Sequence, residues 1–264
     1  MIIEGDYNEN GYVVIREFFN NNEIIELASH VDKVYESWLE KNKTEILNTS
    51  LVNMHSLTHQ EYFTNSYPDD ASNDRIELFN AITPSKLIDL MDEMFREEIY
   101  LHNTQLFFNP LNSKKRPYWH RDMQFSPAPD HIQKDELHNM LSLHIRIPLE
   151  NEKGLEIITG THKRWDTELE NKVRFELDGH NSNECLPNAK RIDLNAGDII
   201  IFHAQMIHRG NYDLNGSRKA LDLCVGSSHY LTLPYLDKNI LPTLKEQDQI
   251  KNKKWFESAR SLLK

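Results

Sequence analysis

The feature that most constrains the fold of this chain is a change in its hydrophobic pattern at about residue 99. From there on, short apolar or alternating segments follow one another, separated by turn residues such as Pro110, Pro127 and the pair Asn215-Gly216. Alternation of this kind is typical of β-strands with one buried face. The segments are IYLHNTQLFF, YWHRDMQF, NMLSLHIRIPL, GLEIIT, RIDL, DIIIFHAQMIHRG and RKALDLCVGSSH.

The residues before this point have a different pattern. A short opening strand, GYVVIREF, precedes a helix predicted at about 22–42, and an irregular polar region then runs through about residue 75. A second amphipathic helix is predicted over PSKLIDLMDEMFREE. Helices first and strands afterwards predict a mainly β fold with flanking helices and a jelly-roll, cupin-like core.

We expect one domain over residues 1–264, because this length suits a single large β-rich unit. Residues 1–98 are expected to form a helical buttress with the opening strand, 99–232 the β core and 233–264 a C-terminal helical segment. The charged, turn-rich insert at about 165–190 is predicted to be a long loop over the mouth of the barrel.

Composition excludes several classes of function. The net charge of −11 argues against a nucleic-acid or anionic-membrane surface. No apolar run approaches the ~20 residues that span a bilayer, and no secretory signal is evident, so a soluble cytoplasmic protein with a small-molecule substrate is expected. Cys185 and Cys224 lack the spacing of a disulfide framework or a thiolate zinc site. The oligomeric state is left open.

His120 and Asp122, in YWHRDMQF, are candidate metal ligands. A chain with 13 histidines and 41 acidic residues also holds such a triplet by chance, as at His30 and Asp32. That second triplet lies in the predicted helix at 22–42, where side chains two apart point in nearly opposite directions. The stretch around His120 is predicted to be a short strand, on which both side chains share one face.

A third ligand is needed, and His203 and His208 are the candidates. They differ by five positions, so one strand cannot aim both inward. Two histidines and a carboxylate form the facial triad of non-haem Fe(II) oxygenases, whose dianionic cosubstrate needs a cation such as Arg218. A hairpin turning at Asn215-Gly216 would bring Arg218 alongside His208, but on the same face only with a bulge at Gly210 or a wider loop.

These segments together resemble the phytanoyl-CoA dioxygenase family of Fe(II)/2-oxoglutarate-dependent oxygenases. The ordered set ENGYVVIREFF, WHRD, GLEIITGTHK, GDIIIF and IHRGNYDLNGSRKAL carries the resemblance over most of the chain. It implies a double-stranded β-helix fold and the use of Fe(II), 2-oxoglutarate and O2. It also implies His120, Asp122 and His208 as iron ligands, Arg218 on the distal carboxylate of 2-oxoglutarate, and Gln105 and His144 lining the cosubstrate pocket.

The sequence departs from the family pattern at three places: Asn109 stands where relatives carry a lysine, Gly210 where they carry a serine, and TGTH at Thr159–His162 where they carry PGSH. These departures concern the substrate more than the iron site.

The alternation of apolar and polar residues in MLSLHIRIPL gives an indication of the substrate class. His144 and Arg146 share one face of that predicted strand, and an arginine inside a barrel requires an anion. The anion is either a protein carboxylate in an internal salt bridge or a group on the substrate. The second reading predicts that Arg146, together with Gln124, binds a small acidic or zwitterionic metabolite, which is hydroxylated with release of succinate and CO2.

Two other classes of function stay open. A metal-dependent cupin-type isomerase or hydrolase would need a general base but not Arg218, and a non-catalytic relative would bind a ligand on the same fold. Halogenation is disfavoured, because Asp122 fills the position that a halide would occupy.

Overall fold

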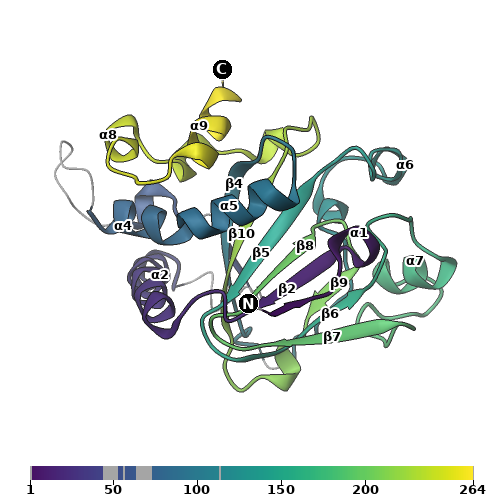
Figure 1. The fold of residues 1–264 in the computed structure, drawn as a ribbon. Coiled ribbons are helices and arrows are strands. Elements are labelled where there is room, and N and C mark those ends of the chain that lie inside the picture. The colour runs from purple at the N-terminus through teal and green to yellow at the C-terminus, as the bar shows by residue number, and fades with distance from the viewer. Residues whose placement is uncertain (1, 44–52, 56, 64–72, 113, 264) are drawn as a thin grey trace.

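The computed structural model describes residues 2–43, 53–55, 57–63, 73–112 and 114–263. Two antiparallel sheets lie face to face, and helices cover the outer face of the larger one (Figure 1). This is the predicted mainly β fold with flanking helices and a jelly-roll, cupin-like core. Within the described residues, no helix is both long and apolar enough to cross a membrane.

The larger sheet contains seven strands, and neighbouring strands are antiparallel. Strand β5 lies at its centre between β8 and β10, and all seven of its residues are buried. In spatial order the strands are β1 (Ile2–Glu4), β2 (Tyr12–Arg16), β8 (Ile199–His203), β5 (Ser142–Pro148), β10 (Lys219–Gly226), β4 (Tyr100–Phe108) and β3 (Asn53–His55).

The smaller sheet has three strands in the order β7 (Ala189–Leu194), β6 (Glu152–Ile158) and β9 (His208–Gly210). Residues of β2 and β8 alternate between two cores, as the period of two requires. Ile199 and Ile201 pack on the side of the helices, whereas Ile200 and Phe202 pack against β6 and β7. The space between the two sheets is therefore filled at one end by an apolar core.

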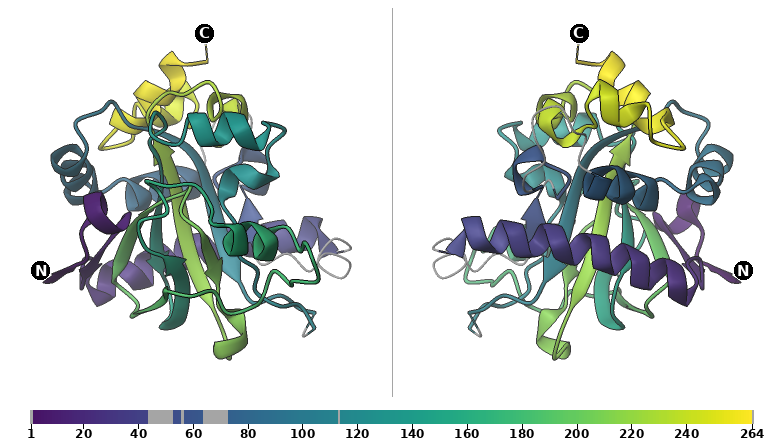
Figure 2. Two further views of the ribbon diagram at one scale, coloured as in Figure 1. Left: turned by 90° about the vertical axis from the view of Figure 1, so that its right-hand side faces the viewer. Right: turned by 90° about the vertical axis from the view of Figure 1, so that its left-hand side faces the viewer.

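Helices cover the outer face of the larger sheet and the end of the molecule where the chain terminates; Figure 2 shows the longest of them, α2, lying across that face. The α-helices are α1 (Tyr7–Asn10), α2 (Asn21–Lys41), α4 (Asn73–Ile82), α5 (Ser85–Met94), α6 (Asp130–Asp135), α7 (Glu168–Arg174), α8 (Leu244–Gln247) and α9 (Lys254–Ser261). The described residues also form the 3-10 helices η1 (Gln60–Tyr62), η2 (Asp122–Phe125), η3 (Tyr212–Leu214), η4 (Leu233–Tyr235) and η5 (Lys238–Ile240).

Helix α2 confirms the helix predicted at about 22–42. It begins with a capping box, in which the Asn20 side chain accepts from the backbone N–H of Glu23 and the Glu23 side chain accepts from that of Asn20. Its buried face includes Leu27 and Val31, and the triplet His30 to Asp32 lies within it. The Asp32 carboxylate pairs with Lys219 at 2.7 Å, and neither His30 nor Asp32 is in a possible metal-ligand group of the described residues.

Helix α4 was not predicted, because it begins in a polar stretch that alternation and apolar spacing did not mark. Arg75 of this helix is fully buried and donates to Glu246 of α8 at 2.6 Å. It also donates to the carbonyls of Thr58 and Leu241 at 2.9 and 2.7 Å. A buried, hydrogen-bonded ion pair thus joins the amino-terminal helices to the carboxyl-terminal segment.

Candidate metal and cosubstrate site

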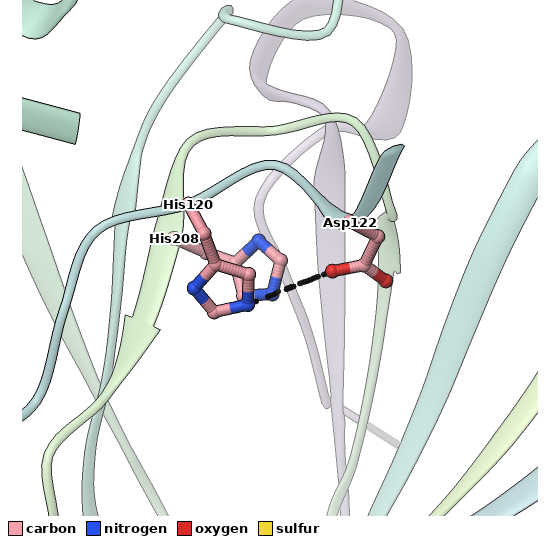
Figure 3. Close-up of side chains that lie close together, drawn as sticks. All are labelled: His120, Asp122 and His208. Carbon is pink, nitrogen blue, oxygen red and sulfur yellow. Dashed lines mark ion pairs between the residues drawn. The ribbon is translucent and has the colours of Figure 1, made fainter. Parts of the chain in front are cut away.

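Two of the three predicted metal ligands are held side by side by a short piece of antiparallel pairing. His120 and His208 form an isolated β-bridge, in which each backbone N–H donates to the carbonyl of the other at 3.0 Å. Their imidazole rings consequently lie next to each other, with centroids 4.2 Å apart (Figure 3).

The segment around Asp122 is not the strand that the alternation predicted. Only His120 forms a bridge, and the chain then turns into the 3-10 helix η2, which begins at Asp122. Arg121, between the two ligands, keeps an extended backbone with φ −111° and ψ 145°. A single extended residue is enough to leave the side chains on either side of it on one face. The prediction of a strand was wrong, but its consequence for His120 and Asp122 holds.

Arg121 anchors this turn from the opposite side. Its side chain is fully buried and donates to the Asp166 carboxylate at 2.9 Å and to the carbonyl of Thr161 at 2.7 Å. It also donates to the carbonyl of Gln205. Because these partners hold Arg121 away from the sheet interior, His120 and Asp122 are directed into it.

Backbone carbonyls select the tautomer of both histidines. Nδ1 of His120 lies 3.1 Å from the carbonyl of Tyr118, and Nδ1 of His208 lies 2.9 Å from that of Met206. A carbonyl oxygen only accepts, so each Nδ1 carries the proton and each Nε2 presents a lone pair. The two Nε2 atoms lie 3.6 and 3.4 Å from Oδ1 of Asp122.

The charges of these groups suit a divalent cation. Burial first and the neighbouring His120 second lower the pKa of His208 to about 3, against the opposing effect of Asp122. Burial likewise lowers the pKa of His120. Burial alone would raise the pKa of Asp122, but the imidazoles around it, His144 first, hold that pKa well below its ordinary value. Two neutral imidazoles and one carboxylate are therefore available together at neutral pH.

These three residues fit the donor set of a mononuclear Fe(II) site. They offer ligand atoms that all lie within 4.8 Å of one another. Two imidazoles and one carboxylate on one side of a metal leave its other positions open, as the facial triad requires. His203, the other candidate, is not part of the group, because its Nε2 lies 3.0 Å from the carbonyl of Met140 in the core.

The three residues face a cavity of about 600 Å³ between the sheets. All three side chains that the family resemblance assigned to the cosubstrate also border it: Gln105 from β4, His144 from β5, and Arg218, which immediately precedes β10. The cavity thus places the candidate metal ligands and the predicted cosubstrate residues in one space.

Arg218 reaches this cavity by a route that differs from the predicted hairpin. Strands β9 and β10 do not pair with each other, because β9 belongs to the smaller sheet and β10 to the larger one. The connection is the wider loop considered above, and it contains η3. Arg218 nonetheless lies against Gly210, where a Cβ atom would come within 2.7 Å of its Nη2.

The guanidinium of Arg218 is only partly satisfied by the protein. Its Nε donates to Oε1 of Glu152 at 2.6 Å, whereas its buried Nη1 has no hydrogen-bond partner within the described residues. A buried unpaired donor is costly, so Nη1 indicates a place for an anionic group from outside the protein. Arg218 therefore fits the role of a carboxylate receptor.

Glu152 also binds Arg146, the residue for which an internal salt bridge and a substrate contact were the two predictions. Nε and Nη2 of Arg146 donate to the two oxygens of Glu152 at 2.9 and 2.8 Å. Although burial raises it, the charges of Arg146 and Arg218 lower the pKa of Glu152 to about 2. The structure thus gives Arg146 the internal salt bridge, the alternative to substrate binding.

A second carboxylate extends the pairing to the metal ligands. Nη1 of Arg146 donates to Oδ1 of Asp222 at 2.8 Å, and Oδ2 of Asp222 lies 3.1 Å from Nδ1 of His144. Nε2 of His144 in turn lies 2.5 Å from Oδ2 of Asp122. A continuous chain of charge-assisted contacts therefore connects Asp122 to Glu152 and Arg218.

Gln124, the other residue expected to bind substrate, is held elsewhere. Its Oε1 accepts from Nε and Nη2 of Arg174 at 3.2 and 2.9 Å, and it is not among the described residues that border the cavity. The turn into η2 explains this, because it aims Gln124 differently from a strand residue two positions after Asp122.

The insert at 165–190 contains helix α7, and none of the described residues bordering the cavity comes from it. It packs behind the ligands instead. The Trp119 indole donates to the carbonyl of Glu184 at 2.8 Å, and Val173 and Leu186 share a small apolar cluster with Trp119. The predicted loop over the mouth is therefore, in the structure, a support for the segment that carries His120.

Sequence reasoning singled out neither Glu152 nor Asp222. Both are nearly fully buried acidic residues on strands, and their arginine partners include distant ones: Arg218 for Glu152 and Arg146 for Asp222. Among 41 acidic residues, Asp222 is marked as inward-facing only by its place in the strand ALDLCV, and Glu152, between Asn151 and Lys153, carries no such mark.

Known proteins are similar to this chain in sequence pattern and in fold. The sequence model of the family described as "Phytanoyl-CoA dioxygenase (PhyH)" matches residues 7–220, which is most of the chain. The chain belongs to the phytanoyl-CoA dioxygenase family. No curated protein matches it.

Solved structures similar to this family member are distant in sequence. HygX from Streptomyces hygroscopicus, with nickel and 2-oxoglutarate bound, is 13% identical with a TM-score of 0.55, over 86% of each chain. EctD from S. alaskensis, with 2-oxoglutarate and 5-hydroxyectoine, is 15% identical with a TM-score of 0.51, over 95% of this chain and 80% of its own. SnoN from nogalamycin biosynthesis, an α-ketoglutarate-dependent epimerase, is 12% identical with a TM-score of 0.51, over 84% of this chain and 78% of its own. These likenesses show the fold, and the expected Fe(II) and 2-oxoglutarate agree with them.

Proposed function

We propose that this phytanoyl-CoA dioxygenase family member is an Fe(II)- and 2-oxoglutarate-dependent oxygenase that hydroxylates a small molecule. The observation that carries the proposal is the convergence of two Nε2 lone pairs and one carboxylate oxygen beside a cavity that also contains an unpaired arginine nitrogen. Ligands for a metal ion and a cation for the cosubstrate carboxylate are thus present in the same cavity.

His120, Asp122 and His208 would hold Fe(II). When bound, the metal supplies the redox chemistry by which O2 and 2-oxoglutarate are converted to an oxidant, succinate and CO2. The protein fixes the three ligands before the metal arrives, since carbonyl hydrogen bonds set both imidazole rings and His144 holds the second oxygen of Asp122.

Arg218 would bind the distal carboxylate of 2-oxoglutarate. Its Nη1 is buried without a partner in the part of the chain that the structure describes, and Glu152 fixes the guanidinium by its Nε atom. A guanidinium held in this way can donate two parallel hydrogen bonds to a carboxylate. Gln105 and His144 border the same cavity and would contact the cosubstrate from the sides.

Hydroxylation is the outcome that the facial triad supports most simply, but the same cofactors serve another reaction in a neighbour of this fold. SnoN is an epimerase that depends on α-ketoglutarate. Oxygen from 18O2 in the product would identify hydroxylation, whereas an isomeric product without 18O would identify epimerisation.

The proposal is tested by 2-oxoglutarate turnover. Purified protein with Fe(II), ascorbate and O2 is expected to form succinate from 2-oxoglutarate, and Asp122→Ala is expected to abolish this activity. If neither wild type nor Asp122→Ala formed succinate across a broad substrate panel, the proposal would be wrong. The chain would then be a metal-dependent isomerase or hydrolase, or a non-catalytic ligand-binding protein.

A further inference from the structure

The strand register divides the cavity into two ends. Across the larger sheet, His144 lies opposite Cys224, and Cys224 lies opposite Asn103. Two residues along β10 from Cys224, in the direction of Arg218, Asp222 lies opposite Gln105. The end of the cavity near Arg218 holds the residues proposed to bind the cosubstrate. The end beyond His144 and Cys224 therefore remains for the substrate.

A β-bulge directs one histidine into this second space. Strand β4 pairs with β10 through Asn103 opposite Cys224 and Leu101 opposite Val225, so His102 is an extra residue without a partner across the ladder. The side chains of His102 and Asn103, although adjacent in sequence, both border the cavity. Bulges commonly re-aim a side chain beside an active site in this way.

His102 has hydrogen-bonding capacity that the protein does not use. Its Nε2 is buried and has no hydrogen-bond partner within the described residues. Burial lowers the pKa of His102 to about 4, with a smaller contribution from His144. The ring is therefore neutral at pH 7 and offers one donor and one acceptor.

The charged groups around the cavity already have partners. Among the described residues that border it, the Asp, Glu, Lys and Arg side chains are Asp122, Arg146, Arg218 and Asp222, all members of the metal and ion-pair network. Both ring nitrogens of His144 lie against the carboxylates of Asp122 and Asp222, and the remaining polar side chains include the uncharged Asn103, Ser142 and Thr232. An anionic substrate group near His102 would meet no free cation from these residues, and burying it would be costly.

We propose that His102 forms a substrate subsite that recognises an uncharged polar group, such as a hydroxyl or an amide, on the molecule that is oxidised. This inference rests on the proposed function and replaces the acidic substrate, whose only specific support was Arg146. The group binds because it satisfies Nε2, unpartnered among the described residues, for which a hydroxyl or an amide can act as either donor or acceptor.

The test uses protein loaded with Ni(II) and 2-oxoglutarate, which binds ligands without turnover. Matched pairs of small alcohols or primary amides and the corresponding carboxylic acids are titrated by calorimetry. The uncharged members are expected to bind more tightly. His102→Leu is expected to weaken the best uncharged ligand about tenfold or more, whereas His102→Gln, which keeps a donor and an acceptor, retains most of its affinity. The exposed His138 supplies the matched control His138→Leu.

The readout is the ratio of the two dissociation constants within one variant, because a loss of fold would weaken both ligands alike. The proposal is overturned if no uncharged member binds, if the acids bind as tightly as their partners, or if His102→Leu leaves the ratio unchanged. Binding of 2-oxoglutarate to the nickel protein is measured first. Its failure would overturn the proposed function as well, whereas success there followed by failure of the panel overturns the subsite alone.

Discussion

At the scale of single residues, the two oxygens of Asp122 have different surroundings. Oδ1 faces the Nε2 atoms of His120 and His208, and Oδ2 lies against His144. The sequence predicts the three ligands because few residue types bind iron and the motif order is that of a known family. It does not predict the role of His144 on Asp122, which depends on how β5 and η2 approach each other.

Replacement of His144 by leucine is expected to weaken metal binding about 10- to 100-fold, since the carboxylate loses the contact that orients it. Ni(II) affinity, measured by competition with a chelator, is the readout. The exposed His131 provides the control variant His131→Leu. An unchanged Ni(II) affinity in His144→Leu would show that Asp122 is oriented by other contacts.

Replacement of Arg218 tests the cosubstrate end of the cavity. Arg218→Ala would leave the distal carboxylate of 2-oxoglutarate without its buried partner, which costs ~2–5 kcal/mol, or about 30-fold or more in affinity. Arg218→Lys is expected to lose less, because the charge remains while the paired geometry is lost. Affinity is measured by calorimetry on the nickel protein, with the more exposed Arg116→Ala as control. A wild-type affinity in Arg218→Ala would assign the carboxylate to another cation.

At the scale of elements, the predictions fail where a strand's pairing partner cannot be inferred from the neighbouring sequence. Alternation over eight residues predicted a strand at 118–125, but only His120 finds a partner there. The pair Asn215-Gly216 predicted a hairpin, yet the flanking strands join different sheets. The long helix at 22–42 was predicted correctly because its apolar periodicity lies within one continuous segment.

The connection between β9 and β10 gives a prediction of its own. In Gly210→Ala the new Cβ would lie 2.7 Å from Nη2 and 3.0 Å from Nη1 of Arg218, whose Nε is fixed by Glu152. The guanidinium would have to shift, so a weaker 2-oxoglutarate affinity with retained Ni(II) binding is expected. Gly216→Ala is the matched control, since no atom lies within 4 Å of its added Cβ. Equal 2-oxoglutarate affinities in the two variants would contradict the close packing of Arg218 on Gly210.

At the scale of the whole molecule, buried ion pairs connect segments far apart in the chain, and they make stability depend on pH. Against the effect of burial, Arg146 and Arg218 lower the pKa of Glu152 from 4.5 to about 2. A lowered carboxyl pKa contributes stability that is fully present above the unfolded pKa and is lost as pH falls through the folded value. Glu152 contributes ~3 kcal/mol to the free energy of unfolding at neutral pH, and this contribution is lost as the pH falls from about 4.5 to about 2.

Glu152→Gln is therefore expected to be less stable than wild type at pH 7, because two buried arginines lose a partner. Its stability should also fall less steeply between pH 4.5 and 2. Urea unfolding at several pH values gives both free energies of unfolding. Parallel pH profiles for the two proteins would show that Glu152 does not titrate with folding as described.

The most direct measurement of the central claim is a crystal structure of the protein grown without O2 in the presence of Fe(II) and 2-oxoglutarate, with anomalous data at the iron edge. The account predicts one iron peak bound by Nε2 of His120, Nε2 of His208 and a carboxylate oxygen of Asp122, with the distal carboxylate of 2-oxoglutarate against Arg218. An iron peak elsewhere, or 2-oxoglutarate bound away from Arg218, would contradict it.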